Sequence, residues 1–303
     1  GFAAVALTDA LQGTVMVIGT VILLVAVVIE GGGVSAIMTT LVAENPQFVS
    51  PFGAEGNLTP LYVSTFWILI GIGVIGLPQI AVRAMSYKDS KGMHRAIIIG
   101  TIGIATVMFG MHLIGVFGRA VMPGIEIGDK VMPTLTLEIL PPILAGIVLA
   151  APMAAIMSTV NALLILVSST VIKDVYLNFI KPTAQDAEIK RLSFIVTTVV
   201  GVSVVLFALN PPEFLIWINL FAFGGLEASF LWAVVLGLYW KKANKYGAFA
   251  SMATGLVLYI YIDRFHQHVF GMHTVTIPVV ASFVVFIIVS LLTQKYTKNQ
   301  QVF

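Results

Sequence analysis

The stretch Ala150-Ala151-Pro152-Met153-Ala154-Ala155-Ile156-Met157-Ser158-Thr159-Val160-Asn161 lies in the middle of a long apolar run and decides how the chain folds. A backbone inside a lipid bilayer must satisfy its own hydrogen bonds, so such a run is predicted to be helical. On a helix, Ala155, Ser158 and Thr159 occupy positions i, i+3 and i+4 and share one face. The two hydroxyls and the carbonyl oxygen of Ala155 could therefore converge on a small monovalent cation.

The same hydroxyls have a simpler alternative use. Serine and threonine in membrane helices commonly donate to the carbonyl four residues earlier and do nothing else. Residue spacing alone leaves both interpretations open.

The composition indicates a polytopic all-α membrane protein. Of the 303 residues, 58% are hydrophobic and 10% are charged, with a mean hydropathy of +1.01. A soluble domain carries about a quarter charged residues. The chain has no cysteine, which excludes disulfides, thiolate metal sites and cysteine nucleophiles. Neither His-Glu-x-x-His nor Gly-x-Ser-x-Gly occurs, so we expect no enzyme, no cofactor and no nucleic-acid partner.

Eight apolar runs are long enough to cross the ~30 Å hydrocarbon core of a bilayer. They lie at about 2–29, 61–82, 96–118, 139–172, 192–209, 214–240, 246–262 and 276–294. The last two contain no buried charge and are interpreted as peripheral supports. We expect one transmembrane domain over residues 1–303.

The basic residues gather on one side of these eight runs. Only Arg119, Lys130 and Arg264 fall in the connections on the other side. Under the positive-inside rule, both ends of this chain are predicted to be cytoplasmic. The thirteen residues on the cytoplasmic side are Arg83, Lys88, Lys91, Arg95, Lys173, Lys181, Lys190, Arg191, Lys241, Lys242, Lys245, Lys295 and Lys298.

The run at 61–82 contains three glycines and Pro78, which leaves the Val74 carbonyl without its usual helical donor. Interrupted membrane segments of this kind often line the binding site of a transporter. Backbone groups at Gly71, Gly73 and Val74 are therefore candidate substrate contacts. The alternative is close helix packing through the glycines.

Two acidic residues lie inside apolar runs, where ionisable groups are functional candidates. Asp9 shares a helical face with Gln12, although a helix dipole could equally favour an interfacial aspartate there. Glu227 lies near the middle of its run, where it must face the protein interior or water. It is a candidate substrate contact, or else a neutral group bonding between helices.

The string at 154–159, followed by Ser168-Ser169 and Lys173-Asp174-Val175-Tyr176, resembles the signature helix of the sodium:solute symporter family. The resemblance spans essentially the whole chain and implies an inverted-repeat fold of five plus five helices. The runs within 2–240 would be core helices five to ten, and those at 246–294 additional C-terminal helices. The chain, which begins at Gly1, would then be an N-terminally truncated fragment that does not transport alone.

The resemblance also implies roles for particular residues. Ala155, Ser158 and Thr159 would hold the coupling sodium ion, and Asp9, within Thr8-Asp9-x-x-Gln12, would lie on the inward sodium path. Substrate would bind at the broken helix and at the run that contains Glu227. Transport would proceed by alternating access, driven by the sodium gradient.

Several strings resemble the pantothenate-transporting branch of the family in particular. They imply sodium-driven pantothenate import across a bacterial cytoplasmic membrane. The alternatives are another organic solute, such as a monocarboxylate or amino acid, or a sensor or scaffold that does not transport. The strings lie at 75–78, 85–91, 109–113, 149–153 and 220–231.

Overall fold

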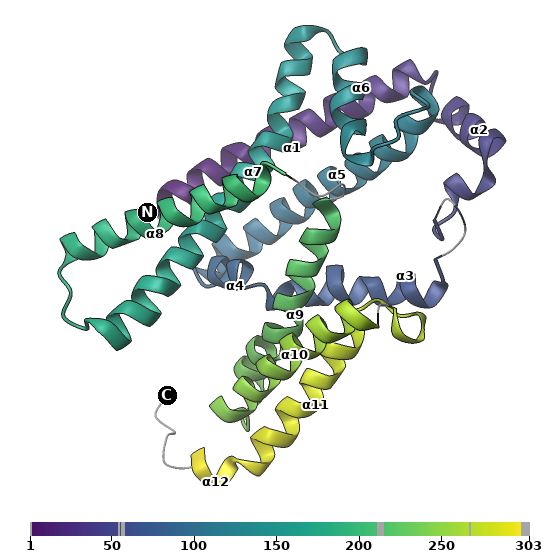
Figure 1. The fold of residues 1–303 in the computed structure, drawn as a ribbon. Helices are drawn as coiled ribbons and strands as arrows, with labels where there is room; N and C mark the ends of the chain where they lie inside the picture. The colour runs from purple at the N-terminus through teal and green to yellow at the C-terminus, as the bar shows by residue number, and fades with distance from the viewer. Residues whose placement is uncertain (1, 54, 56–57, 211–214, 267, 298–303) are drawn as a thin grey trace. The chain divides into compact units, whose positions relative to one another are not determined.

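The computed structural model describes residues 2–53, 55, 58–210, 215–266 and 268–297, and these residues contain helices and no strand. They form two compact units. The first unit is Gly1–Glu44 with Ser90–Glu213, and the second is Asn45–Asp89 with Phe214–Phe303. Figure 1 shows the helices of each unit. The expectation of one transmembrane domain over residues 1–303 stays a prediction.

The first unit is built on four long helices, α1, α5, α7 and α8, with shorter helices in the connections. The helix α1 packs against both α7 and α5, and α8 packs against α7. The π-helix η5 continues α7 without a gap. The bounds are α1 Phe2–Glu30, α2 Val34–Glu44, α5 Ser90–Val121, η4 Gly128–Lys130, α6 Val131–Ile139, α7 Pro142–Ser169, η5 Thr170–Ile180 and α8 Asp186–Ala208.

The second unit contains the interrupted helix and three longer helices that pack on one another. The helix α9 contacts α10, α11 and the 3-10 turn η3. The bounds are η1 Pro46–Val49, α3 Pro60–Trp67, η2 Ile68–Ile72, η3 Gly73–Gly76, α4 Pro78–Ala84, α9 Leu215–Tyr239, α10 Lys245–Phe265, η6 Val269–Gly271, α11 Thr276–Leu292 and α12 Gln294–Thr297.

Six of the eight predicted spans are supported by length and composition. In the described part of the chain, five helices qualify as candidate spans, and the bent pair from Pro60 to Ala84 would make a sixth. The other two predicted runs form the helices α10 and α11, which are not among the helices that are both long and apolar enough to cross a membrane. At 17 residues, α11 is short for a crossing. Phe214 and Lys298, used in the span and charge predictions, lie outside the described residues.

Small residues bring α1 close to its neighbours in the first unit. A Cβ on Gly19 would lie 2.7 Å from the Cβ of Ala151 in α7, and a Cβ on Gly110 of α5 would collide with Thr20. Glycine at such positions lets two membrane helices approach closely. Polar groups on α1 and α7 are thereby brought within hydrogen-bond reach of each other.

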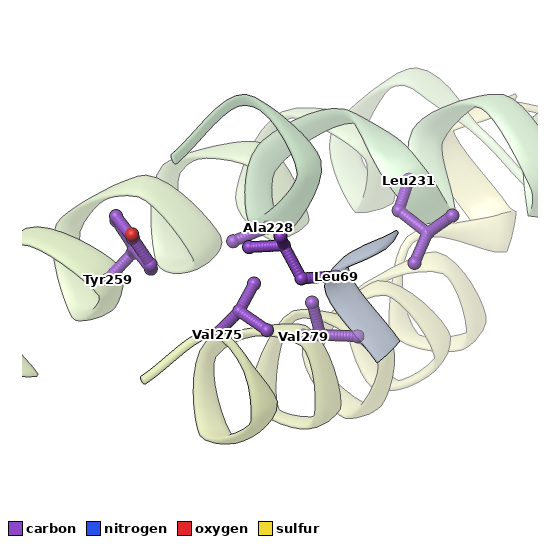
Figure 2. Packing of buried hydrophobic residues seen from close by; sticks show 6 residues of the cluster. All are labelled: Leu69, Ala228, Leu231, Tyr259, Val275 and Val279. Atoms are coloured by element: carbon purple, nitrogen blue, oxygen red, sulfur yellow. The ribbon is translucent and has the colours of Figure 1, made fainter. Parts of the chain in front are cut away.

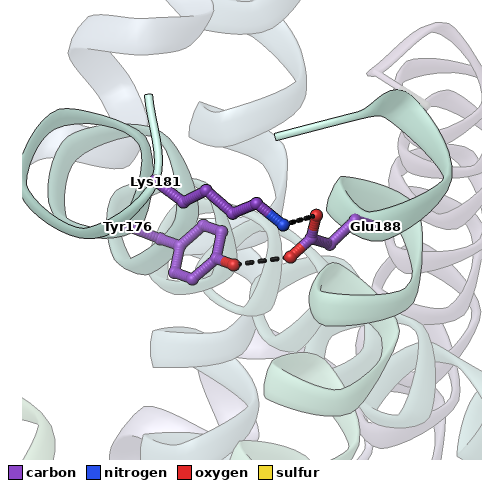
Figure 3. Close-up of polar contacts among 3 residues, drawn as sticks. All are labelled: Tyr176, Lys181 and Glu188. Atoms are coloured by element: carbon purple, nitrogen blue, oxygen red, sulfur yellow. Dashed lines mark hydrogen bonds and ion pairs between the residues drawn. The ribbon is translucent and has the colours of Figure 1, made fainter. Parts of the chain in front are cut away.

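A three-residue polar cluster closes the turn between η5 and α8 (Figure 3). The Tyr176 hydroxyl donates to Glu188 Oε1, and the Lys181 ammonium group donates to Glu188 Oε2, each over 2.7 Å. Because Lys181 and Glu188 are partly open to solvent, their ion pair adds little to stability. The cluster fixes the geometry of the connection instead.

The core of the second unit joins the interrupted helix to α9, α10 and α11. Figure 2 shows Leu69 from η2 among apolar side chains of the other helices, namely Ala228, Leu231, Tyr259, Val275 and Val279. The Trp232 indole N–H donates to the Val279 carbonyl over 2.7 Å, which ties α9 to α11. Residues of the two runs interpreted as peripheral supports therefore form part of this core.

A close approach of α9 and α10 depends on Gly255, where a Cβ would overlap the Ala228 carbonyl oxygen. We expect Gly255→Val to destabilise the protein by about 1–3 kcal/mol, because the α9 backbone would have to move. Gly237→Val is the matched control, since nothing lies within 4 Å of a Cβ there. Thermal unfolding of the detergent-solubilised protein measures both. Equal melting temperatures for the two variants would contradict the packing.

Candidate functional site

The predicted break in the second apolar run is present and has a well-defined geometry. The helix α3 loosens into the π turn η2, tightens into the 3-10 turn η3, and ends at Leu77, whose backbone is extended. A new helix begins at Pro78, and the two parts are bent by 53°. Proline suits this first helical position because it lacks the N–H that would otherwise be left unpaired. The break is therefore local and encoded by Gly76, Leu77 and Pro78.

The Val74 carbonyl lacks the helical donor that Pro78 cannot supply, as predicted, but it is not left free. The Leu77 N–H donates to the Val74 carbonyl over 3.1 Å, replacing the donor that Pro78 lacks. A 3-10 turn makes this bond because it pairs residues three apart rather than four. Of the other predicted backbone contacts, Gly71 is exposed with open space around it, whereas Gly73 is buried.

Gly73 lies directly against Glu227 of α9. A Cβ on Gly73 would overlap Oε2 of the Glu227 carboxyl, so only glycine allows this approach. The neighbouring contact is equally tight, since a Cβ on Gly76 would lie 2.6 Å from the Leu231 backbone nitrogen. The structure thus brings together two predicted substrate residues, Gly73 and Glu227, that are far apart in the sequence.

The carboxyl of Glu227 is fully buried and unsatisfied. Its side chain is 0% exposed, and neither carboxyl oxygen has a hydrogen-bond partner among the described residues. A buried polar group without a partner is destabilising, and a buried unpaired charge much more so. A hydrogen-bond donor on a bound molecule would therefore gain more at this carboxyl than at a solvated one.

In the first unit, Asp9 of α1 meets Ser158 of α7. The Ser158 hydroxyl donates to Asp9 Oδ1 over 2.8 Å. Ala155 is half-buried one turn earlier on the same face of α7, whereas Thr159 is exposed and its hydroxyl makes no hydrogen bond within the described part of the chain. Ser158 thus reaches across to α1 rather than back to its own helix.

This contact changes the chemistry of the predicted cation site. Sequence reasoning gave three neutral oxygens on α7 and treated Asp9 separately. With Asp9 beside Ser158, a carboxylate joins those oxygens, which strengthens the attraction for a hard cation. The two residues are 149 positions apart, so no local pattern could have paired them.

A pocket in the second unit was missed by the sequence analysis. Its volume is about 420 Å³, and one side is formed by the connection between α10 and α11. The His273 backbone N–H in that connection donates to Thr65 Oγ1 of α3 over 2.9 Å. Burial lowers the pKa of His273 to about 4, so its ring is neutral at pH 7. The lining residues are Tyr62, Leu220, Phe221, Tyr259, Asp263, His268, His273 and Thr274.

Comparison with known proteins gives close relatives over nearly all of the chain. The sodium/pantothenate symporter of Haemophilus influenzae is 46% identical over 303 residues, and that of Escherichia coli K12 is 51% identical over 290 residues. These alignments cover 99% and 95% of this chain, and 62% and 60% of the relatives. An osmoregulated proline transporter of Bacillus subtilis is 30% identical over 98% of the chain. The chain spans about 60% of the length of these relatives.

A solved structure of similar fold is the substrate-bound, outward-open form of a Na⁺-coupled sialic acid symporter. The TM-score between this chain and that symporter is 0.72 at 20% sequence identity, and the match covers 98% of this chain and 63% of the symporter chain. The likeness confirms the expected all-helical sodium-symporter fold of an integral membrane protein. The model of the sodium:solute symporter family matches residues 1–255. The chain therefore belongs to the sodium:solute symporter family, whose members are transporters and not enzymes.

Proposed function

We propose that the complete protein is a secondary transporter that imports pantothenate together with sodium. The choice of pantothenate as substrate rests on the 46–51% identity to proteins named sodium/pantothenate symporters over nearly the whole chain. The geometry supports the transporter class, because a broken helix with a buried, unsatisfied carboxyl beside it is typical of a transport site.

The sodium part of the proposal rests on α1 and α7. Sodium binds through Ala155, Ser158 and Thr159, and Asp9 lies on its way to the cytoplasm. The Ser158–Asp9 hydrogen bond supports this route, because a cation leaving Ser158 finds a carboxylate within 2.8 Å of that hydroxyl. Because occupied and empty sites favour different conformations, the inward sodium gradient drives the alternating access of the site to the two sides of the membrane.

The substrate part rests on the break and on α9. Gly71, Gly73, Val74 and Glu227 are the proposed substrate contacts, and Gly73 lies directly against the Glu227 carboxyl. Pantothenate has a carboxylate, an amide and two hydroxyls. The hydroxyls and the amide N–H are donors that would satisfy the Glu227 carboxyl, whereas the pantothenate carboxylate must point away from an ionised Glu227.

An amino acid is the second candidate substrate. The chain is 30% identical to an osmoregulated proline transporter of Bacillus subtilis and 29% identical to sodium/proline symporters of Staphylococcus aureus. These identities are well below those to the pantothenate relatives. A monocarboxylate, or a sensor or scaffold role, has no comparable support.

The orientation in the membrane is also a proposal. Both ends of this chain lie in the cytoplasm, and the membrane is the bacterial cytoplasmic membrane. Thirteen of the sixteen Lys and Arg residues fall on that side of the predicted spans.

The test of function is uptake of labelled pantothenate into vesicles that contain the full-length gene product. We expect uptake to require an inward sodium gradient. In the double variant Ser158→Ala with Thr159→Ala, the sodium concentration for half-maximal uptake should rise about tenfold or more, since two ligand oxygens are lost.

Ser203→Ala is the matched control for this variant. The Ser203 hydroxyl in α8 donates to the Val199 carbonyl of its own helix and has no part in the proposed site. Sodium-driven uptake of another solute but not of pantothenate would contradict the substrate. An unchanged sodium requirement in the double variant would contradict the ion site.

The Gly73–Glu227 contact can be tested by a double-mutant cycle on the stability of the same protein. We expect Gly73→Ala to cost about 1–3 kcal/mol, because the new methyl group overlaps the Glu227 carboxyl. In a Glu227→Ala background most of this cost should vanish, whereas in a Glu227→Gln background it should remain. Additive effects of Gly73→Ala and Glu227→Ala would rule out the contact. Gly71→Ala, in open space, serves as the control.

The orientation can be tested with single cysteines in an otherwise cysteine-free background. Asp186 and Glu126 are both exposed, and the proposal assigns them to opposite sides of the membrane. A membrane-impermeant maleimide added to intact cells should label Glu126→Cys and spare Asp186→Cys until the cells are opened. The reverse pattern of labelling would invert the orientation.

A further inference from the structure

Two contacts fix how α1 and α7 align within the first unit. Near one end of the interface, the Asp9 carboxylate accepts from Ser158. Further along α1, Gly19 lies against Ala151, and a Cβ on Gly19 would also be 3.6 Å from the Val148 backbone. Residue numbers rise along α1 as they fall along α7, so the two helices run antiparallel.

Gln12 lies between these two contacts on α1. Successive residues of an α-helix turn by 100°, so Gln12 points within about 20° of the direction of Gly19 and falls between Gly19 and Asp9 around the helix. Since both of those residues contact α7, Gln12 faces α7 as well. Three residues from Asp9 toward Gly19, it is level with the turn of α7 that contains Ala155.

The α7 face opposite Gln12 is lined by small side chains. Ala151, Ala155 and Ser158 stand at i, i+4 and i+7 and form one stripe along the helix. The short side chain of Ala155 leaves room at this level for a longer side chain from α1. The Gln12 amide therefore reaches toward the part of α7 whose carbonyl and hydroxyl oxygens form the proposed sodium site.

Gln12 is buried but not satisfied. The residue is 9% exposed, and its amide oxygen Oε1 has no hydrogen-bond partner among the described residues. Buried side-chain oxygens are normally paired, so an exception at a proposed ion route needs an explanation. A neutral amide oxygen is a hard ligand of the kind that alkali and alkaline-earth cations accept.

We propose that the amide oxygen of Gln12 is a further ligand for the transported sodium ion. Together with the Ala155 carbonyl, the Ser158 hydroxyl and the Asp9 carboxylate, it forms a line of oxygens along the α1–α7 interface. The ion passes from the neutral oxygens near Ala155 to the carboxylate of Asp9 without losing oxygen contacts on the way. This inference rests on the proposed sodium-coupled function and adds Gln12 to the proposed path of the sodium ion.

The test uses the full-length transporter in vesicles and compares Gln12→Met with Gln12→Glu. Methionine keeps the length of the side chain and removes the oxygen, so the sodium concentration for half-maximal uptake should rise about tenfold. The pantothenate KM at saturating sodium should stay unchanged, which a merely structural defect would not achieve. Glutamate keeps an oxygen and adds charge, so the sodium requirement should stay equal or fall.

Thr14→Val is the matched control on α1, because the Thr14 hydroxyl is exposed and donates to the Ala10 carbonyl of its own helix. A normal sodium requirement in Gln12→Met would overturn the inference. Should Gln12→Met fail to reach the membrane, Gln12→Glu decides alone, and a raised sodium requirement there would overturn the inference. Absence of sodium-driven uptake by the unmodified protein would instead refute the proposed function.

Discussion

The structure depends on one constraint, which is that a backbone in lipid must satisfy its own hydrogen bonds. Helices meet this constraint directly, and a break is tolerated only where the freed groups find other partners. Between Ile68 and Leu77 the chain meets this constraint with a π turn, a 3-10 turn and a hydrogen bond from the Leu77 N–H to the Val74 carbonyl. Packing of Leu69 and Gly76 against α9 then buries part of the irregular backbone.

Close approach of neighbouring helices is the second requirement, and glycine allows it beside the polar groups of both proposed sites. Gly19 allows α1 to meet α7, which brings Asp9 to Ser158. Gly73 allows the broken helix to meet α9, which places its backbone against the Glu227 carboxyl. In each unit, a close contact at a polar group therefore depends on a glycine, Gly19 near the Asp9–Ser158 hydrogen bond and Gly73 against the Glu227 carboxyl. The polar groups and the packing around them cannot be varied independently.

Each unit contributes a different part of the proposed chemistry. The first unit holds oxygen atoms suited to a cation, on two antiparallel helices that meet through small residues. The second unit holds a buried carboxyl with no partner, next to a helix break. Both sites contain polar atoms that the described residues leave unsatisfied, namely Oε1 of Gln12 and the two oxygens of Glu227. In the proposed transporter, those atoms are where ion and solute supply the missing interactions.

The amino-acid sequence by itself determined the all-α membrane class, the six supported spans, the break before Pro78 and the family, because hydropathy, proline chemistry and motif strings are local properties. It did not show that the Val74 carbonyl accepts from the Leu77 N–H three residues away, and its last two spans, at α10 and α11, are helical but lie outside the six supported ones. Only the tertiary structure decided that Asp9 pairs with Ser158, that Gly73 lies on Glu227 and that Gln12 faces α7. Those pairings join residues distant in sequence, and helix packing, rather than any local pattern, sets which side chains meet.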